Sequence, residues 1–133
     1  MLVRKLTLTL RLALGLLVLG MAARAVDAAD SLDSKTFDVQ VSDGKEVSPD
    51  VLAFNGGALH SSASNRYGFK DASYTATLAD GTINFEAVSK SEDFGTMTWK
   101  GKVTGNAVEG TAVWDRGFWH WKRAYVFNGS LRQ

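Results

Sequence analysis

The fold is decided by residues 95–114, which read GTMTWKGKVTGNAVEGTAVW. Apolar and polar side chains alternate on both sides of Gly105-Asn106, and a two-residue turn of this kind suits an antiparallel hairpin. Folding there pairs Trp99 with Ala112 and Met97 with Trp114, all on one face. A shift of one residue would turn that apolar set toward solvent, so the register is well specified. We therefore predict strands over residues 95–103 and 107–114.

Two more hairpins follow from the same reasoning. Asp80-Gly81 joins a strand over 72–78 to one over 82–89, which pairs Leu78 with Ile83 and Ala76 with Phe85. Gly56-Gly57 joins residues 51–55 to 58–62. The pairs expected in these two hairpins also include Tyr74 with Ala87, Phe54 with Leu59, and Leu52 with Ser61.

One strand precedes these hairpins, over residues 35–42, and one closes the chain, over residues 123–131. We expect residues 29–34 to be a loose lead-in and Pro49 to lie between strands. The eight predicted strands follow an up-and-down order, and eight antiparallel strands can close into a barrel. Gly101, Gly110 and Gly129 on the inward parity permit sharp bending. The prediction is an all-β, eight-stranded antiparallel barrel, with a β-sandwich as the alternative.

Residues 1–28 have the pattern of a cleaved secretory signal. Arg4, Lys5 and Arg11 give a basic start, the apolar run from 12 to 23 follows, and small residues precede the boundary. The apolar run of about 12 residues is shorter than the roughly 20 that a membrane span needs. We expect cleavage after Ala28, or after Ala25, which leaves a single β domain over 29–133 that is periplasmic or secreted and has no membrane span.

Charge and cysteine content limit the function classes. The leader holds four of the 15 basic and one of the 14 acidic residues, so 11 basic and 13 acidic residues remain. A mildly acidic domain is a poor nucleic-acid binder, because phosphate binding needs clustered positive charge. The chain has no Cys, which excludes thiol chemistry and thiolate metal sites. Packing and hydrogen bonds alone must hold the domain together, and this favours a closed sheet.

Residues 95–105 and 109–114, with Tyr67-Gly68-Phe69 and residues 125–129, resemble a group of small exported bacterial proteins of unknown function. The resemblance extends over roughly Lys35 to Leu131. It implies a lipocalin-like, or broadly calycin-like, β-barrel. It supplies no functional residues.

The densest unusual segment is residues 114–125, which holds three of the four tryptophans. One interpretation is an aromatic platform at the barrel mouth, with a cation–π contact from Arg123. The other is a long hairpin whose aromatic side chains cover one barrel end. We expect Phe118 and Trp119, beside Gly117, to be the most exposed. The 67–69 segment is expected to form either a lid over an opening or a plug on the core.

No residues form a recognisable catalytic or metal site. His60 and His120 are the only histidines, and a metal site usually needs three or more converging ligands. No Gly-x-Ser-x-Gly motif marks a nucleophile. We therefore expect no enzyme activity, no metal and no cofactor.

The leading hypothesis is an exported binding protein that holds a small apolar or amphiphilic molecule inside the barrel. The alternative is an envelope interaction protein or inhibitor that acts through the aromatic loop 115–123. The partner is then either a small apolar ligand or an envelope protein. The predicted ligand-binding residues are Phe54, Tyr74, Phe85, Trp99, Trp114, Trp119, Trp121, Arg123 and Tyr125.

Overall fold

A computed structural model describes residues 32–118 and 121–133 of the 133-residue chain. The predicted signal over residues 1–28, its cleavage site, Trp119 and His120 lie outside the described residues. In the part of the chain that is described, no helix is long and apolar enough to cross a membrane.

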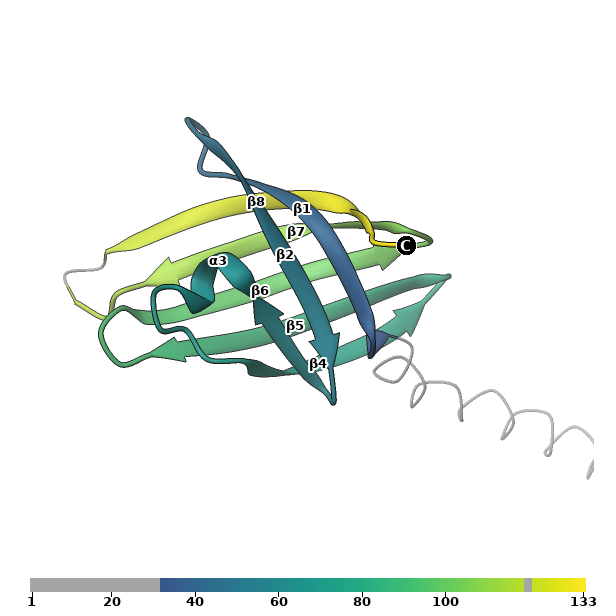
Figure 1. Ribbon diagram of the computed structural model, residues 1–133, viewed down its shortest axis with the longest axis horizontal. Coiled ribbons are helices and arrows are strands. Elements are labelled where there is room, and N and C mark those ends of the chain that lie inside the picture. The colour runs from purple at the N-terminus through teal and green to yellow at the C-terminus, as the bar shows by residue number, and fades with distance from the viewer. Residues whose placement is uncertain (1–31, 119–120) are drawn as a thin grey trace, which may run out of the picture.

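The described chain is a closed barrel of eight antiparallel strands in sequence order, with β8 pairing back onto β1 (Figure 1). The predicted fold class is confirmed, and the alternative of a β-sandwich is wrong. The elements are β1 (Lys35–Ser42), β2 (Val47–Asn55), β3 (Ala58–Ser61), α3 (Ser62–Asn65), β4 (Ala72–Ala79), β5 (Thr82–Ser91), β6 (Gly95–Thr104), β7 (Ala107–Asp115) and β8 (Lys122–Leu131).

All three predicted hairpin registers are confirmed. Trp99 pairs with Ala112 across β6 and β7, Ala76 with Phe85 across β4 and β5, and Phe54 with Leu59 across β2 and β3. The glycines of the turns have positive φ, at 58° in Gly105 and 76° in Gly81, which is the backbone that tight hairpin turns require. Turn chemistry and side-chain alternation therefore point to the same register.

The position expected for Pro49 is wrong: it lies within β2 and pairs with Gln40 of β1. Strand β2 is longer than predicted because it begins at Val47. Its pairing with β3 covers only residues 52–55, so residues 47–51 have β1 as their one strand neighbour among the described elements. A proline is tolerated in such an edge segment, where one side of the strand carries no ladder.

The end of the expected lead-in is packed, not loose. Leu32 is fully buried in the core. The Asp33 carboxylate accepts hydrogen bonds from the Tyr74 hydroxyl at 2.6 Å and from the Gly57 backbone N–H at 3.0 Å. These contacts hold the residues just before β1 against the β2–β3 turn and β4. One apolar residue in a polar segment is a weak sequence signal, which is why the pattern missed it.

The two ends of the barrel differ. The β4–β5 and β6–β7 hairpin turns lie with the C-terminus on the right of Figure 1, and the connections to α3, β6 and β8 lie toward the left. Leu32 and a set of rings fill the first of these ends. Phe54 sits at the centre of that set, with its ring centroid 6.0 Å from Phe37 and 5.0 Å from both Tyr74 and Phe85. We call this the closed end.

Tyr74→Phe is expected to remove stability that depends on pH. Hydrogen bonds from the Tyr74 hydroxyl, and then from the Gly57 N–H, hold the pKa of Asp33 below its usual 3.8. A lowered folded-state pKa stabilises the protein above the unfolded-state value, and this contribution is lost as the pH falls through the folded-state pKa. In urea titrations at pH 7, the free energy of unfolding of the wild type should exceed that of Tyr74→Phe. The difference between the two should narrow below about pH 4. A gap that stays constant down to pH 2 would contradict this assignment.

Candidate ligand-binding cavity

A partly open cavity of about 760 Å³ lies at the other end of the barrel, which we call the open end. Its opening lies between the β1–β2 turn, the segment that contains α3, and the start of β8. In Figure 1, α3 lies in front of the long strands, and the β1–β2 turn projects at the top. The interior is packed with core side chains at the closed end, and at the open end the cavity borders buried core residues such as Met97 and Trp99.

The deep wall of the cavity is apolar. Trp99, Ala112 and Tyr125 lie side by side on β6, β7 and β8, because Ala112 pairs with both of the others. The methyl group of Ala112 is short, so it leaves space between the two large rings. The inward-facing apolar lining residues are Val39, Val41, Phe69, Met97, Trp99, Ala112, Trp114 and Tyr125.

The mouth of the cavity is polar. Arg66 and Arg123 line it together with Asp43 and Glu46 of the β1–β2 turn. Backbone N–H groups of Glu46 and Lys45 donate to the Asp43 carboxylate at 2.8 and 2.9 Å, and these bonds, with the charge of Arg123, lower the pKa of Asp43. An apolar interior below a charged opening suits a molecule with one apolar and one polar end.

The lid over one side of the mouth is α3 with the residues that follow it. The buried carboxylate of Asp50 accepts from the Ser61 hydroxyl at 2.5 Å and from the Ala63 N–H at 2.9 Å. Ser61 is the N-cap of α3, and its hydroxyl oxygen accepts from the Ser64 N–H. This network anchors a one-turn helix that has too few residues to be stable alone.

Asp50→Ala is expected to lower the free energy of unfolding by about 3 kcal/mol, because the Ser61 hydroxyl and the Ala63 N–H lose the carboxylate that accepts their hydrogen bonds. The amide of Ala63 should also exchange with solvent faster. Asp50→Asn keeps one acceptor oxygen and is expected to lose about half as much. Urea titration and hydrogen exchange measure both effects. Equal stability of Asp50→Ala and the wild type would show that the network does not hold α3.

The segment Tyr67-Gly68-Phe69 combines the two roles weighed from the sequence. Phe69 is buried, and its ring centroid lies 6.4 Å from that of Trp114, so its side chain packs into the barrel. Tyr67 is exposed, and its ring lies 5.8 Å from that of Phe94. Both residues line the cavity, so the segment plugs part of the opening and forms part of its edge.

An arginine–aromatic cluster lies beside this segment. The guanidinium carbon of Arg116 lies 5.7 Å from the ring centroids of Phe94 and Trp114 and 5.6 Å from those of Phe118 and Trp121. The predicted cation–π contact of Arg123 also exists, 5.6 Å from Trp121. Sequence reasoning missed Arg116, although its place within the aromatic segment was a usable signal.

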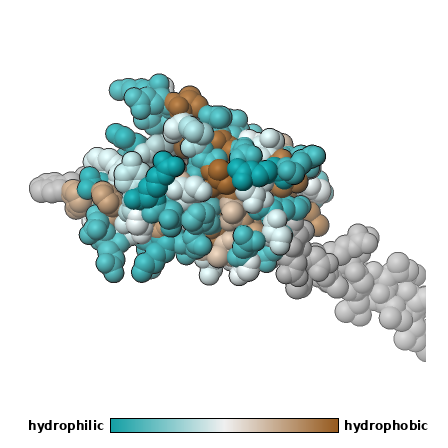
Figure 2. Space-filling model, in the orientation of Figure 1, coloured by the Kyte–Doolittle hydropathy of each residue, from teal (hydrophilic) through white to brown (hydrophobic). Residues whose placement is uncertain are grey.

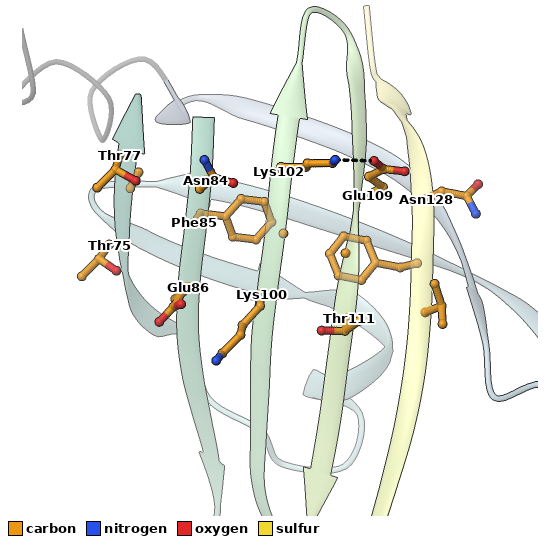
Figure 3. A pocket seen from close by; sticks show the side chains of 15 residues that line it. Thr75, Thr77, Asn84, Phe85, Glu86, Lys100, Lys102, Glu109, Thr111 and Asn128 are labelled. Carbon is orange, nitrogen blue, oxygen red and sulfur yellow. Dashed lines mark ion pairs between the residues drawn. The ribbon is translucent and has the colours of Figure 1, made fainter. Parts of the chain in front are cut away.

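The predicted ligand-binding residues fall into separate places. Trp99, Trp114, Arg123 and Tyr125 line the cavity. Phe54, Tyr74 and Phe85 are buried at the closed end, where the Phe54 ring contacts both of the others, and none of them lines this cavity. Phe85 lines a groove on the outer face of the barrel instead (Figure 3). Trp121 packs edge to face on Trp114 with the centroids 4.8 Å apart. Trp119 lies outside the described residues.

His60 is paired with a carboxylate on the surface. Its Nδ1 lies 2.6 Å from Asp71 Oδ1, and the side chains of His60 and Asp71 are 36% and 55% exposed. Within residues 32–118 and 121–133, no group of three or more His, Cys, Asp and Glu side chains converges in a way that would hold a metal ion.

An open groove of about 630 Å³ crosses the outer face of β4 to β8 (Figure 3). Two rows of mostly polar side chains border it, and Lys102 forms an ion pair with Glu109 at 3.1 Å. One row is Thr75, Glu86, Lys100, Thr111 and Val126; the other is Thr77, Asn84, Lys102, Glu109 and Asn128. The groove is exposed and its charges are solvated, so it is a weaker candidate site than the cavity.

The face shown in Figure 2 is largely hydrophilic, with hydrophobic patches that are small and separated. Phe118, in the β7–β8 connection, is 55% exposed, as the sequence predicted. A few scattered apolar side chains are normal on a protein surface, but an exposed phenylalanine beside an arginine is a candidate contact residue.

No protein-family model matches this chain, and neither the curated proteins nor the solved structures gave a match.

Proposed function

We propose that this protein is an exported, non-enzymatic binding protein that holds one small apolar or amphiphilic molecule in its barrel. The observation that carries the proposal is the cavity of about 760 Å³ at the open end. Pockets that enclose small molecules measure about 300–1,000 Å³ and are mostly apolar with a few placed polar groups. The export assignment rests on the signal pattern of residues 1–28.

The direction of binding follows from the lining. The apolar part of the ligand lies against Met97, Trp99 and Ala112, and its polar end meets the mouth near Arg66 and Arg123. The packed closed end leaves the mouth as the route of entry.

Native mass spectrometry tests the proposal on protein purified without detergent from the cells that make it. We expect a discrete excess mass that is lost on denaturation and that identifies the ligand. A parallel titration uses N-phenyl-1-naphthylamine, which becomes fluorescent in apolar surroundings, and should saturate at one molecule per chain. A bare mass together with no saturable fluorescence would overturn the proposal.

The second candidate function, an interaction protein or inhibitor, is favoured by the exposure of Phe118 within the arginine–aromatic cluster. Interface hot spots are enriched in aromatic residues and arginine. A photo-crosslinking amino acid at position 118 should then give one discrete adduct in cells. The same amino acid at Val88, which is 49% exposed, is the matched control. Identical products at both positions would remove this candidate.

A further inference from the structure

Two arginines that line the mouth of the cavity have no ionic partner among the described residues. Arg66 follows α3 directly, and Arg123 lies near the start of β8. None of the ion pairs within residues 32–118 and 121–133 includes either of them. In the same part of the chain, the arginine side chain that donates hydrogen bonds is that of Arg132, to Asp38. Both exposed guanidinium groups of the mouth therefore keep their N–H donors for an acceptor from outside the protein.

Most acidic side chains of the lining are already bonded within the protein. Asp38 is paired with Arg132, and Asp50 is held by the network that anchors α3. The carboxylate of Asp43 accepts from two backbone N–H groups of its own turn. Glu46 is the one acidic lining residue whose carboxylate has no such partner in the described part of the chain. The mouth thus has more unused hydrogen-bond donors than acceptors, which favours a ligand with an anionic polar end.

The guanidinium of Arg123 is held in a position that suits an anion. Its carbon lies 5.6 Å from the ring centroid of Trp121. On the ladder, Arg123 pairs with Trp114, which in turn pairs with Met97, so apolar lining residues lie directly beside it. Stacking on an indole face leaves the edges of the planar guanidinium free, and these edges bind carboxylate and phosphate with two parallel hydrogen bonds.

The apolar lining continues from Arg123 toward the closed end. Tyr125 is the next inward residue of β8, and it lines the cavity together with Trp99 and Ala112 of the adjoining strands. The inward residue after it, Phe127, is fully buried and does not line the cavity. At about 3.3 Å per residue, an apolar tail has at most about 13 Å along β8 between Arg123 and Phe127. This length matches an extended chain of about ten carbons joined by bonds of about 1.5 Å.

We propose that the ligand is a single-tailed amphiphile with an anionic head, a carboxylate or a phosphate, which Arg66 and Arg123 bind at the mouth. This inference rests on the proposed function and specifies the charge of the ligand's polar end. A free fatty acid and a phosphate-headed lipid share this chemistry, so the test includes one probe of each kind.

The test uses four probes with near-identical straight tails and different heads: decanoate, monodecyl phosphate, decan-1-ol and decyltrimethylammonium. Each competes with N-phenyl-1-naphthylamine in a fluorescence titration, at concentrations below those at which it forms micelles. The two anions should bind at least about 5-fold more tightly than decan-1-ol, and the cation should bind most weakly. The tighter of the two anions assigns the head as carboxylate or phosphate.

Arginine variants locate the head. Arg66→Gln and Arg123→Gln should each weaken binding of the tighter anion about 3- to 10-fold and change decan-1-ol binding by less than about twofold. Lys90→Gln is the matched control, because Lys90 is an exposed cation on the outer face of β5 that lines neither the cavity nor the outer groove. It should bind all four probes like the wild type.

Two results separate failure of this inference from failure of the proposed function. Equal affinity for the four probes, or displacement of the dye by none of them, would overturn the anionic head while the cavity that binds the dye stands. Unchanged anion binding in both arginine variants would do the same. If N-phenyl-1-naphthylamine itself shows no saturable binding, the proposed function fails as well.

Discussion

Ala112→Met is expected to weaken binding of N-phenyl-1-naphthylamine at least about 10-fold, which corresponds to about 1.4 kcal/mol of binding free energy. The short side chain of Ala112 lies between Trp99 and Tyr125 in the apolar part of the cavity lining. A methionine there extends into the same space that the ligand would occupy. Fluorescence titration measures the loss directly.

The matched control is Ala124→Met. Ala124 is exposed on β8, next in sequence to Tyr125 and on the opposite face of the strand. This variant adds the same side chain to the outside of the barrel and should bind the probe like the wild type. Since overpacking costs about 1–3 kcal/mol of stability, near-ultraviolet circular dichroism should first establish that Ala112→Met is folded. Equal affinity of the two variants would place the probe elsewhere.

Gly110→Ala is expected to lower the free energy of unfolding by about 3 kcal/mol, toward the upper end of overpacking effects. A Cβ at Gly110 would overlap the carbonyl oxygen of Lys100 and lie 2.6 Å from the Cα of Gly101 and 2.7 Å from Cζ of Phe127. Two of these three atoms belong to the backbone of the paired strand β6, which cannot move without breaking the ladder. The measurement is a urea unfolding curve with its midpoint and slope.

Gly105→Ala is the control for Gly110→Ala. Gly105 has a φ of 58°, and a Cβ there would meet no atom within 4 Å. Gly105→Ala should therefore lower the free energy of unfolding by only about 1–2 kcal/mol, the strain of holding an alanine in the left-handed backbone conformation. If Gly110→Ala proves no more destabilising than Gly105→Ala, the close approach of β6 and β7 does not depend on glycine.

The barrel was predictable because local and long-range signals agree in this chain. Turns such as Gly105-Asn106 and Asp80-Gly81 fix the hairpin registers, and the alternation of side chains assigns each residue to the inner or outer face. The alternation does not show how far along the barrel axis a residue lies. For this reason Phe54 and Trp99 were both predicted to face inward and bind a ligand, although Phe54 lies at the closed end and Trp99 lines the cavity.

Other features were not predictable because they depend on tertiary contacts. Pro49 enters β2 because that part of the strand carries no ladder on its β3 side. Leu32 is buried because Asp33 binds Tyr74 and Gly57, which are distant in sequence. The Arg116 cluster draws its rings from two connections and from β7. Each of these depends on partners that a local pattern cannot identify.

The central claim, that a small molecule lies inside the open end of the barrel, is tested most directly by its position. Nuclear Overhauser effects between bound N-phenyl-1-naphthylamine and methyl groups of the protein report that position. We expect contacts to Val39, Met97 and Ala112, which line the cavity. Contacts confined to outward-facing Val88 and Val126, or none at saturating probe, would contradict it.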